Sequence, residues 1–250
     1  LDLGLPTLST SPKEPDMFIY FSEALRIKSK YMQVTAKIGI LFDLDGVLID
    51  SENGYSEIWK KINKDFPTGI DNLEVIIKGC TLEKILSDYF PAKDMSEKVT
   101  KRLYDLEAQM HYDYKPGAKE LLRQLSESGI PKVLVTSSNA DKMRHLFNEL
   151  PELEECFDHI ITANLIKRSK PDPEGYLLGA SKINLNAARC VVFEDSLQGV
   201  KAGRNAGAFV IGVAGTLPAS TLQPYSDLVI NSLTEINLNQ LIERMLENEK

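Results

Sequence analysis

Strand-like and helix-like segments alternate along this chain from Gly117 to its last residue. Short apolar runs rich in β-branched residues are followed by longer stretches whose apolar residues have helical spacing. This alternation predicts a parallel sheet, because consecutive parallel strands need a long crossover that usually contains a helix. Right-handed crossovers then place helices on both faces. We therefore expect an α/β fold with a doubly wound parallel sheet.

The expected elements divide the chain unevenly. The strand-like runs are residues 38–42, 132–135, 159–162, 190–193, 209–213 and 228–230. The helix-like segments that separate or follow them are 118–128, 140–150, 174–182, 196–206 and 235–246. Further helix-like stretches, 53–66, 81–89 and 96–111, lie between the first and second strands, with no convincing strand among them. The pattern predicts a helical insertion in the α/β core.

Residues 1–36 differ from the rest of the chain. Pro6, Pro12 and Pro15 interrupt a segment rich in Ser and Thr, which is typical of irregular structure. Met32 lies just before the first core strand, so we expect it to be the natural first residue and the upstream part to be an artefact of the start site or of expression. The predicted organisation is an irregular extension (1–36), an α/β core (37–50 and 114–250) and a helical insertion (51–113).

Composition excludes several classes of function. A net charge of −7 and a sequence pI of about 5.2 give no basic footprint for nucleic acid. The cysteines Cys80, Cys156 and Cys190 are far apart, which fits neither a disulfide framework nor a zinc cluster. No apolar run approaches the roughly 20 residues of a membrane span, and no secretory signal is evident. We expect a cytoplasmic protein with reduced thiols that binds neither nucleic acid nor membrane.

Two carboxylates follow the first strand directly. Asp43 and Asp45 flank one leucine, and Gly46 allows a sharp turn just beyond them. In open α/β sheets, chemistry is placed at the carboxyl ends of strands. Two carboxylates held this close repel each other unless a cation or a shared proton is present. Oxygen ligands at a strand end suit Mg²⁺, so the pair predicts a magnesium site.

Other polar residues follow later strands or loops. Thr136 ends the second strand, Lys170 precedes a proline, and Glu194 and Asp195 end the fourth strand. We expect these side chains to converge on one crevice, because the carboxyl ends of parallel strands share one edge of the sheet. Asp195 is a candidate to share a metal with Asp43.

An anion site is expected beside this edge. The Thr136 hydroxyl and the N–H groups of Ser137 and Ser138 lie at the start of a predicted helix, a favourable place for phosphate. Lys170 can bind the same anion as a point charge. Each feature alone has a simpler explanation. The aspartates, the Thr-Ser-Ser-Asn run and the Glu-Asp pair are residues that commonly begin helices, as caps or in the first turn. Lys170 alone is typical of a solvated surface charge.

Together these motifs resemble the haloacid dehalogenase superfamily, in particular its β-phosphoglucomutase-like group with a helical cap after the first strand. The matching stretches are 43–47 (Asp-Leu-Asp-Gly-Val), Thr136, Lys170 with Pro171, and 194–200 (Glu-Asp-Ser-Leu-Gln-Gly-Val). The likeness spans about residues 38–230. It implies a Rossmann-like catalytic core with an inserted α-helical cap domain.

The resemblance also implies roles for the residues. Asp43 would be the nucleophile that forms an aspartyl-phosphate, and Asp45 would act first as general acid and then as base. Mg²⁺ would be held by Asp43, the backbone carbonyl of Asp45 and Asp195, with Glu194 as ligand or outer partner. Lys170 would hold the phosphoryl oxygens together with Thr136. The proton donor at Asp45 argues for phosphoryl transfer rather than dehalogenation.

The insertion departs from true β-phosphoglucomutases. A histidine and an arginine that carry mutase function there correspond to Tyr55 and Leu82 here, which cannot replace an imidazole or a guanidinium. We therefore expect hydrolysis of a small phosphorylated metabolite, such as a sugar phosphate. Lys78 and Lys84 are candidates for contacting it, with surface solvation as the alternative for each.

Two other functions stay open at this point. One is a phosphoglucomutase-type transferase, and the other is a non-catalytic binding module on the same fold. The sequence does not specify the substrate, and the expected state is a monomer or weak homo-oligomer.

Overall fold

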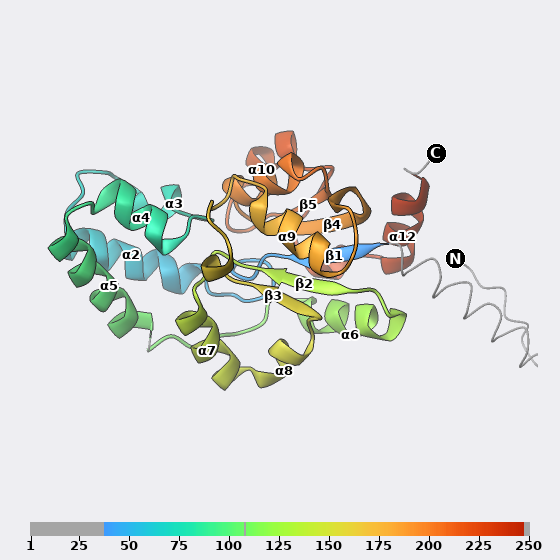
Figure 1. Ribbon diagram of the computed structural model, residues 1–250, viewed down its shortest axis with the longest axis horizontal. Coiled ribbons are helices and arrows are strands. Elements are labelled where there is room, and N and C mark those ends of the chain that lie inside the picture. The colour runs from blue at the N-terminus through green and yellow to red at the C-terminus, as the bar shows by residue number, and fades with distance from the viewer. Residues whose placement is uncertain (1–37, 108, 248–250) are drawn as a thin grey trace, which may run out of the picture.

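The computed structural model describes residues 38–107 and 109–247. The irregular extension expected over residues 1–36, and the assignment of Met32 as the natural start, lie outside these ranges. Within the described part, the doubly wound α/β fold is confirmed: one parallel sheet has helices on both faces, and a group of helices extends from one end of it (Figure 1).

The sheet has six strands in the order β3-β2-β1-β4-β5-β6, with all pairs parallel. Their bounds are β1 Gly39–Phe42, β2 Lys132–Val135, β3 His159–Ile161, β4 Cys190–Glu194, β5 Phe209–Val213 and β6 Leu228–Ile230. The central strands β1, β2 and β4 are buried along their whole length. This explains why they read as continuous apolar runs rather than as alternating ones.

Helices cover both faces of the sheet. The first apolar core cluster joins the sheet to α6 (Ala118–Ser128), α7 (Ala140–Glu149), α8 (Pro151–Glu155) and α12 (Leu238–Glu247). The second joins it to α9 (Glu174–Lys182), α10 (Leu197–Asn205) and α11 (Ala219–Leu222). In the register, Phe42 of β1 lies opposite Phe193 of β4, and their rings stack with centroids 4.9 Å apart. Packing of these two clusters fixes the central strands and therefore the positions of their carboxyl ends.

A separate helical unit follows β1, here called the cap. It consists of α2 (Glu52–Asp65), α3 (Leu73–Ile76), α4 (Leu82–Tyr89) and α5 (Lys93–Glu107). These helices pack around their own apolar cluster, which includes Ile62 and Leu73. Figure 1 shows the cap extending from the end of the sheet where α7 begins.

The two chain segments that connect the cap to the sheet lie side by side. Ile49 forms an antiparallel bridge with Tyr114, and the amide of Asp50 donates to the carbonyl of Asp113 at 2.7 Å. The predicted division between core and cap at residues 51 and 113 stays a proposal, and this paired connection supports it. None of the helices in the described ranges is long and apolar enough to cross a membrane.

The observed helices differ from the expected ones in a few places. The short helix α3 has only four residues, too few to show helical periodicity in the sequence. Pro151 ends the predicted helix as expected but also begins α8, since proline is favoured in the first turn of a helix. Helix α5 begins at Lys93, before the predicted start, because the amides of Met95 and Ser96 already bond to the carbonyl of Ala92.

Candidate active site

The carboxyl ends of β1, β2 and β4 bring the predicted residues to one edge of the sheet. Asp43 follows β1 directly, Thr136 follows β2, and Glu194 is the last residue of β4, with Asp195 next to it. β1 lies between β2 and β4: the chain adds β2 and β3 on one side of β1 and then β4, β5 and β6 on the other. This is the switch point at which doubly wound sheets open a crevice.

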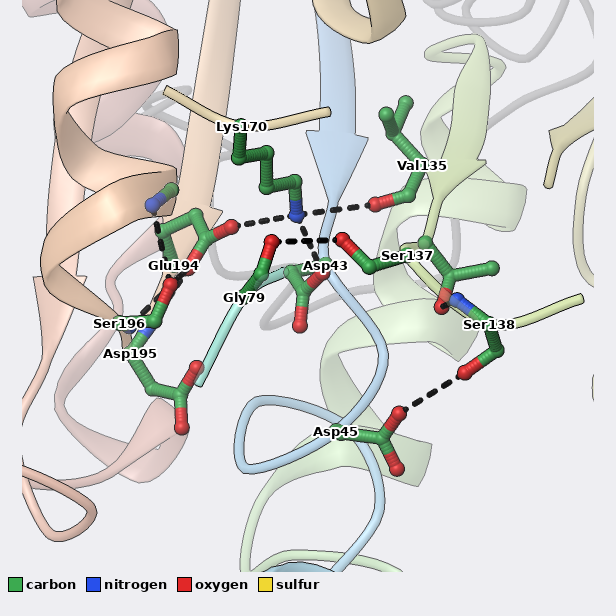
Figure 2. A network of polar contacts seen from close by, with 12 residues as sticks. Asp43, Asp45, Gly79, Val135, Ser137, Ser138, Lys170, Glu194, Asp195 and Ser196 are labelled. Carbon is green, nitrogen blue, oxygen red and sulfur yellow. Dashed lines mark hydrogen bonds and ion pairs between the residues drawn. The ribbon is translucent and has the colours of Figure 1, made fainter. Parts of the chain in front are cut away.

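Lys170 joins the ends of three strands (Figure 2). Its ammonium nitrogen lies 2.5 Å from Asp43 Oδ1, 2.5 Å from Glu194 Oε1 and 3.4 Å from the carbonyl of Val135. Burial by itself lowers the pKa of Lys170, but the two carboxylates outweigh it and raise that pKa above its usual value. Lys170 is therefore a buried cation at the centre of the site and not a solvated surface charge.

Glu194 is fully buried and fixed by several donors. Its Oε1 also accepts from the hydroxyl of Tyr176 at 2.8 Å. Its Oε2 accepts from the amides of Asp195 and Ser196 at 3.0 and 3.1 Å and from the Ser196 hydroxyl at 3.0 Å. A Cβ at Gly199 would lie 1.7 Å from Glu194 Oε1, so this carboxylate requires a glycine in the first turn of α10. Ser196, and not Glu194 or Asp195, caps helix α10. The two acidic residues are therefore part of the polar site at the end of β4.

Three carboxylates in this edge are arranged to hold a cation. Asp43, Glu194 and Asp195 are all buried, and each offers one oxygen within 4.8 Å of the others. Burial raises the pKa of Asp43 to about 8, although Lys170 opposes this effect. Lys170 supplies one positive charge beside these three carboxyl groups, so its ammonium alone does not neutralise them when all three are ionised. An all-oxygen donor set with excess negative charge fits a hard divalent cation such as Mg²⁺.

The backbone turn after Asp45 is part of this arrangement. Gly46 has φ +75°, and a Cβ there would lie 1.8 Å from Asp195 Oδ2. Glycine therefore allows the Asp195 carboxylate to approach the β1 loop closely.

The side chain of Asp45 points away from the three-carboxylate cluster (Figure 2). It accepts hydrogen bonds from the hydroxyls of Ser51 and Ser138, and Lys142 Nζ lies 2.6 Å from its Oδ2. Burial alone would raise the pKa of Asp45, but Lys142 and the hydroxyl donors lower it below its usual range. The Asp45 carboxylate is thus an ionised group in the crevice, apart from the other carboxylates.

The hydroxyls after β2 have different surroundings. The Thr136 side chain is buried, and its Oγ1 accepts from the amide of Ser138 at 3.0 Å. The Ser137 hydroxyl donates to the carbonyl of Gly79 in the cap at 2.9 Å (Figure 2). Asn139 is the residue that caps α7, since its side chain accepts from the amide of Lys142. The structure therefore places Thr136, Ser137 and Ser138 beside the acidic cluster and leaves helix capping to Asn139.

A cavity of about 130 Å³ lies between this edge and the cap. Core residues on its wall include Asp43, Asp45, Ser137 and Asp195. Its cap wall combines the apolar side chains of Trp59, Ile77, Leu82, Ile85 and Leu103 with the charged side chains of Glu74, Lys78 and Glu107. The cavity therefore has the acidic edge of the sheet at one end and both apolar and charged cap side chains at the other.

Candidate cap residues separate into two groups. Tyr55, Leu82 and Lys78 line the cavity, whereas Lys84 lies in a different groove and pairs with Asp88 at 2.9 Å. Neither Tyr55 nor Leu82 supplies a titrating imidazole or a guanidinium to the cavity.

Sequence reasoning missed two residues of this site. Lys142 lies on the buried side of α7, four residues beyond Ser138, and Tyr176 lies in α9. No motif includes either residue. The sequence did contain one indication of Lys142. Helical spacing places this lysine on the same side of the predicted helix as the apolar Met143 and Leu146, where a charged residue is unexpected.

Comparison with known proteins adds a family and several relatives. A profile described as haloacid dehalogenase-like hydrolase matches residues 40–213. Hexitol phosphatase A of Escherichia coli (strain K12) is 34% identical over 209 residues, which cover 81% of this chain and 94% of that protein. Validoxylamine A 7'-phosphate phosphatase of Streptomyces hygroscopicus subsp. limoneus is 32% identical over 205 residues, covering 78% and 94%.

The fold is shared with solved structures. A putative beta-phosphoglucomutase from Bacteroides vulgatus superposes with a TM-score of 0.72 and 26% identity, over 84% of this chain and 90% of that one. Because the superposition covers 84% of this chain, it includes residues of both the sheet and the cap.

Proposed function

The chain belongs to the haloacid dehalogenase-like hydrolase family, and from that membership we propose that it is a Mg²⁺-dependent phosphatase of a small phosphorylated metabolite such as a sugar phosphate. The observation that carries the proposal is the convergence of the Asp43, Glu194 and Asp195 carboxylates, with the buried ammonium of Lys170 bonded to the first two. Two relatives named as phosphatases of phosphorylated metabolites support it.

Asp43 is the nucleophile in this proposal. A carboxylate oxygen of Asp43 attacks phosphorus, the bond from phosphorus to the ester oxygen breaks, and the leaving oxygen takes a proton from the carboxylic acid form of Asp45. In the second step, water gives a proton to the Asp45 carboxylate and attacks the aspartyl-phosphate. The bond to Asp43 then breaks and inorganic phosphate leaves.

The acidic cluster would hold Mg²⁺ through the carboxylates of Asp43, Asp195 and Glu194, together with the backbone carbonyl of Asp45. When bound, Mg²⁺ supplies positive charge that reduces repulsion between the attacking carboxylate and the anionic phosphate. Lys170 adds a second positive charge in the same place. The phosphoryl oxygens are held by Lys170, the Thr136 hydroxyl and the loop of Ser137 and Ser138.

Hydrolysis is favoured over mutase activity by the cap. A mutase must protect its phosphoenzyme from water and bind a second phosphate. Tyr55 donates its hydroxyl to Glu107 at 2.9 Å, and Leu82 gives the cavity an apolar surface, so neither acts as a phosphate ligand. A β-phosphoglucomutase-type transferase remains the second candidate because of the shared fold. Conversion of a hexose 1-phosphate to the 6-phosphate without phosphate release would establish that activity.

We further infer that the enzyme works in the cytoplasm as a monomer or weak homo-oligomer. The cysteines of the described chain, Cys80, Cys156 and Cys190, are free thiols, as expected in a reducing compartment.

Asp43→Asn tests the proposal. It removes the nucleophile while keeping the size of the side chain, so we expect Mg²⁺-dependent release of phosphate from an aryl phosphate to be abolished in a folded protein. Full activity in this variant would refute the mechanism. A screen of phosphorylated metabolites with the wild type then identifies the substrate.

A further inference from the structure

Lys142 is a buried charge that none of the sequence motifs contains. It lies in the first turn of α7, its side chain is only 7% exposed, and Nζ lies 2.6 Å from Asp45 Oδ2. A lysine is rarely buried to this extent unless it is paired, because an ammonium without a partner loses its hydration on burial and gains nothing in return. The pair with Asp45 therefore accounts for the position of Lys142.

The cap covers the other side of the same ammonium. Lys142 Nζ lies 4.0 Å from the centroid of the Tyr55 ring, which belongs to α2. The hydroxyl of Tyr55 is bonded to Glu107 of α5, which fixes the orientation of the ring. Lys142 is thus held between the cap and the acid/base carboxylate of the core, and cation–π contact adds to the ion pair.

Asp45 receives one charged and two neutral donors. Ser51 and Ser138 donate hydroxyls, and Lys142 donates from an ammonium. All three hydrogen bonds end on a carboxylate, but only the one from Lys142 also joins two opposite charges, so Lys142 holds Asp45 by an ion pair as well as by a hydrogen bond. These three donors hold the Asp45 carboxylate in one orientation at the wall of the cavity, where it can accept a proton from a water molecule.

We propose that Lys142 is a positioning residue that holds Asp45 as the base in hydrolysis of the aspartyl-phosphate. The inference rests on the proposed function. In this step the water proton moves to Asp45, the water oxygen bonds to phosphorus, and the bond from phosphorus to Asp43 breaks. The proton then on Asp45 is the one given to the ester oxygen of the next substrate. Lys142 gains and loses no proton.

Formation and hydrolysis of the aspartyl-phosphate can be measured separately, and a positioning role for Lys142 affects them differently from a purely structural role. An aryl phosphate has a stable leaving group, so formation of the aspartyl-phosphate needs no acid, whereas its hydrolysis still needs the base. Loss of Lys142 should slow phosphate release much more than release of the phenolate. A general weakening of the fold or of substrate binding would slow both.

The experiment is rapid mixing of the Mg²⁺-loaded enzyme with p-nitrophenyl phosphate, following nitrophenolate and inorganic phosphate separately. For Lys142→Met we expect the rate of phosphate release to fall roughly tenfold to a hundredfold, with nitrophenolate appearing as a burst at nearly the wild-type rate. Lys142→Arg keeps the positive charge and should restore most of the phosphate release.

Lys119→Met is the matched control. Lys119 also lies over a tyrosine ring, that of Tyr114 at 4.3 Å, and pairs with Glu152 at 3.3 Å, but it is exposed and away from the cavity. Both rates should stay unchanged in this variant.

A second variant guards against failure of Lys142→Met to fold. Tyr55→Leu removes the aromatic face but leaves the ion pair between Lys142 and Asp45. We expect it to slow phosphate release more than nitrophenolate release, by a smaller factor than Lys142→Met does. The proposal is overturned if both rates fall equally or if neither falls in a folded variant. Nitrophenolate release by Asp43→Asn would instead contradict the proposed function and not the role of Lys142.

Discussion

Lys170 and Asp43 are 127 positions apart in the chain, yet the Lys170 ammonium lies 2.5 Å from Asp43 Oδ1. Both side chains are buried, and the same ammonium reaches Glu194. This contact joins the loop before α9 to the ends of β1 and β4. It places positive charge where a carboxylate must approach an anionic phosphate.

Lys170→Met should abolish most of the activity. Removing a donor from a preorganised site costs roughly a hundredfold to a thousandfold in kcat. The change also leaves two carboxylates without their buried partner, which should lower the free energy of unfolding by about 3–5 kcal/mol. Turnover of an aryl phosphate and urea unfolding measure the two effects. Near-wild-type kcat in this variant would show that Lys170 is only structural.

Gly199→Ala should disrupt the site without changing any charge. The added Cβ would lie 1.7 Å from Glu194 Oε1 and must displace that carboxylate. We expect loss of activity and a fall in melting temperature. Gly54→Ala in helix α2 is the matched control, since its Cβ would meet only the flexible end of Met110 at 2.8 Å. Equal effects of the two substitutions would contradict this account of Gly199.

Much of this site could be predicted from the chain because strand ends are local features. The apolar runs and the polar residues after them gave Asp43, Thr136, Glu194 and Asp195, and parallel topology placed them on one edge. The observed strand order places the ends of β1, β2 and β4 side by side, as that prediction requires.

Contacts between distant elements could not be predicted. Lys142 meets Asp45 across 97 positions through the side of a helix, and Tyr176 reaches Glu194 from α9. Such pairings depend on how helices pack on the sheet, and a single sequence does not specify it. The contact of Ser137 with Gly79 likewise depends on where the cap lies against the core.

The metal-free protein should become less stable as pH rises. The folded pKa of Asp43 is raised to about 8 by burial, whereas an unfolded aspartate titrates near 3.9. Between these values the folded state binds more protons than the unfolded state, so this contribution is greatest below about pH 4 and is lost as pH rises toward 8. Urea unfolding in EDTA at several pH values should show this slope, and Asp43→Asn should reduce it. An identical slope in that variant would show that other groups cause it.

Mg²⁺ should stabilise the protein, and more so at higher pH. A cation binds the deprotonated carboxylates of the cluster, so it competes with the proton on Asp43. The rise in melting temperature on adding Mg²⁺ should therefore be larger near pH 8 than near pH 5. Asp195→Asn should weaken the effect at both pH values, and an unchanged Mg²⁺ response in that variant would exclude Asp195 as a ligand.

In the proposed mechanism, Asp43 accepts the phosphoryl group. The most direct measurement is an acid quench of the enzyme during turnover of a phosphate ester, followed by peptide mass spectrometry. We predict a phosphoryl group on Asp43 in the wild type and none in Asp43→Asn. If the wild type releases phosphate while Asp43 stays unmodified, with a phosphoryl group on another residue or on none, then Asp43 is not the nucleophile.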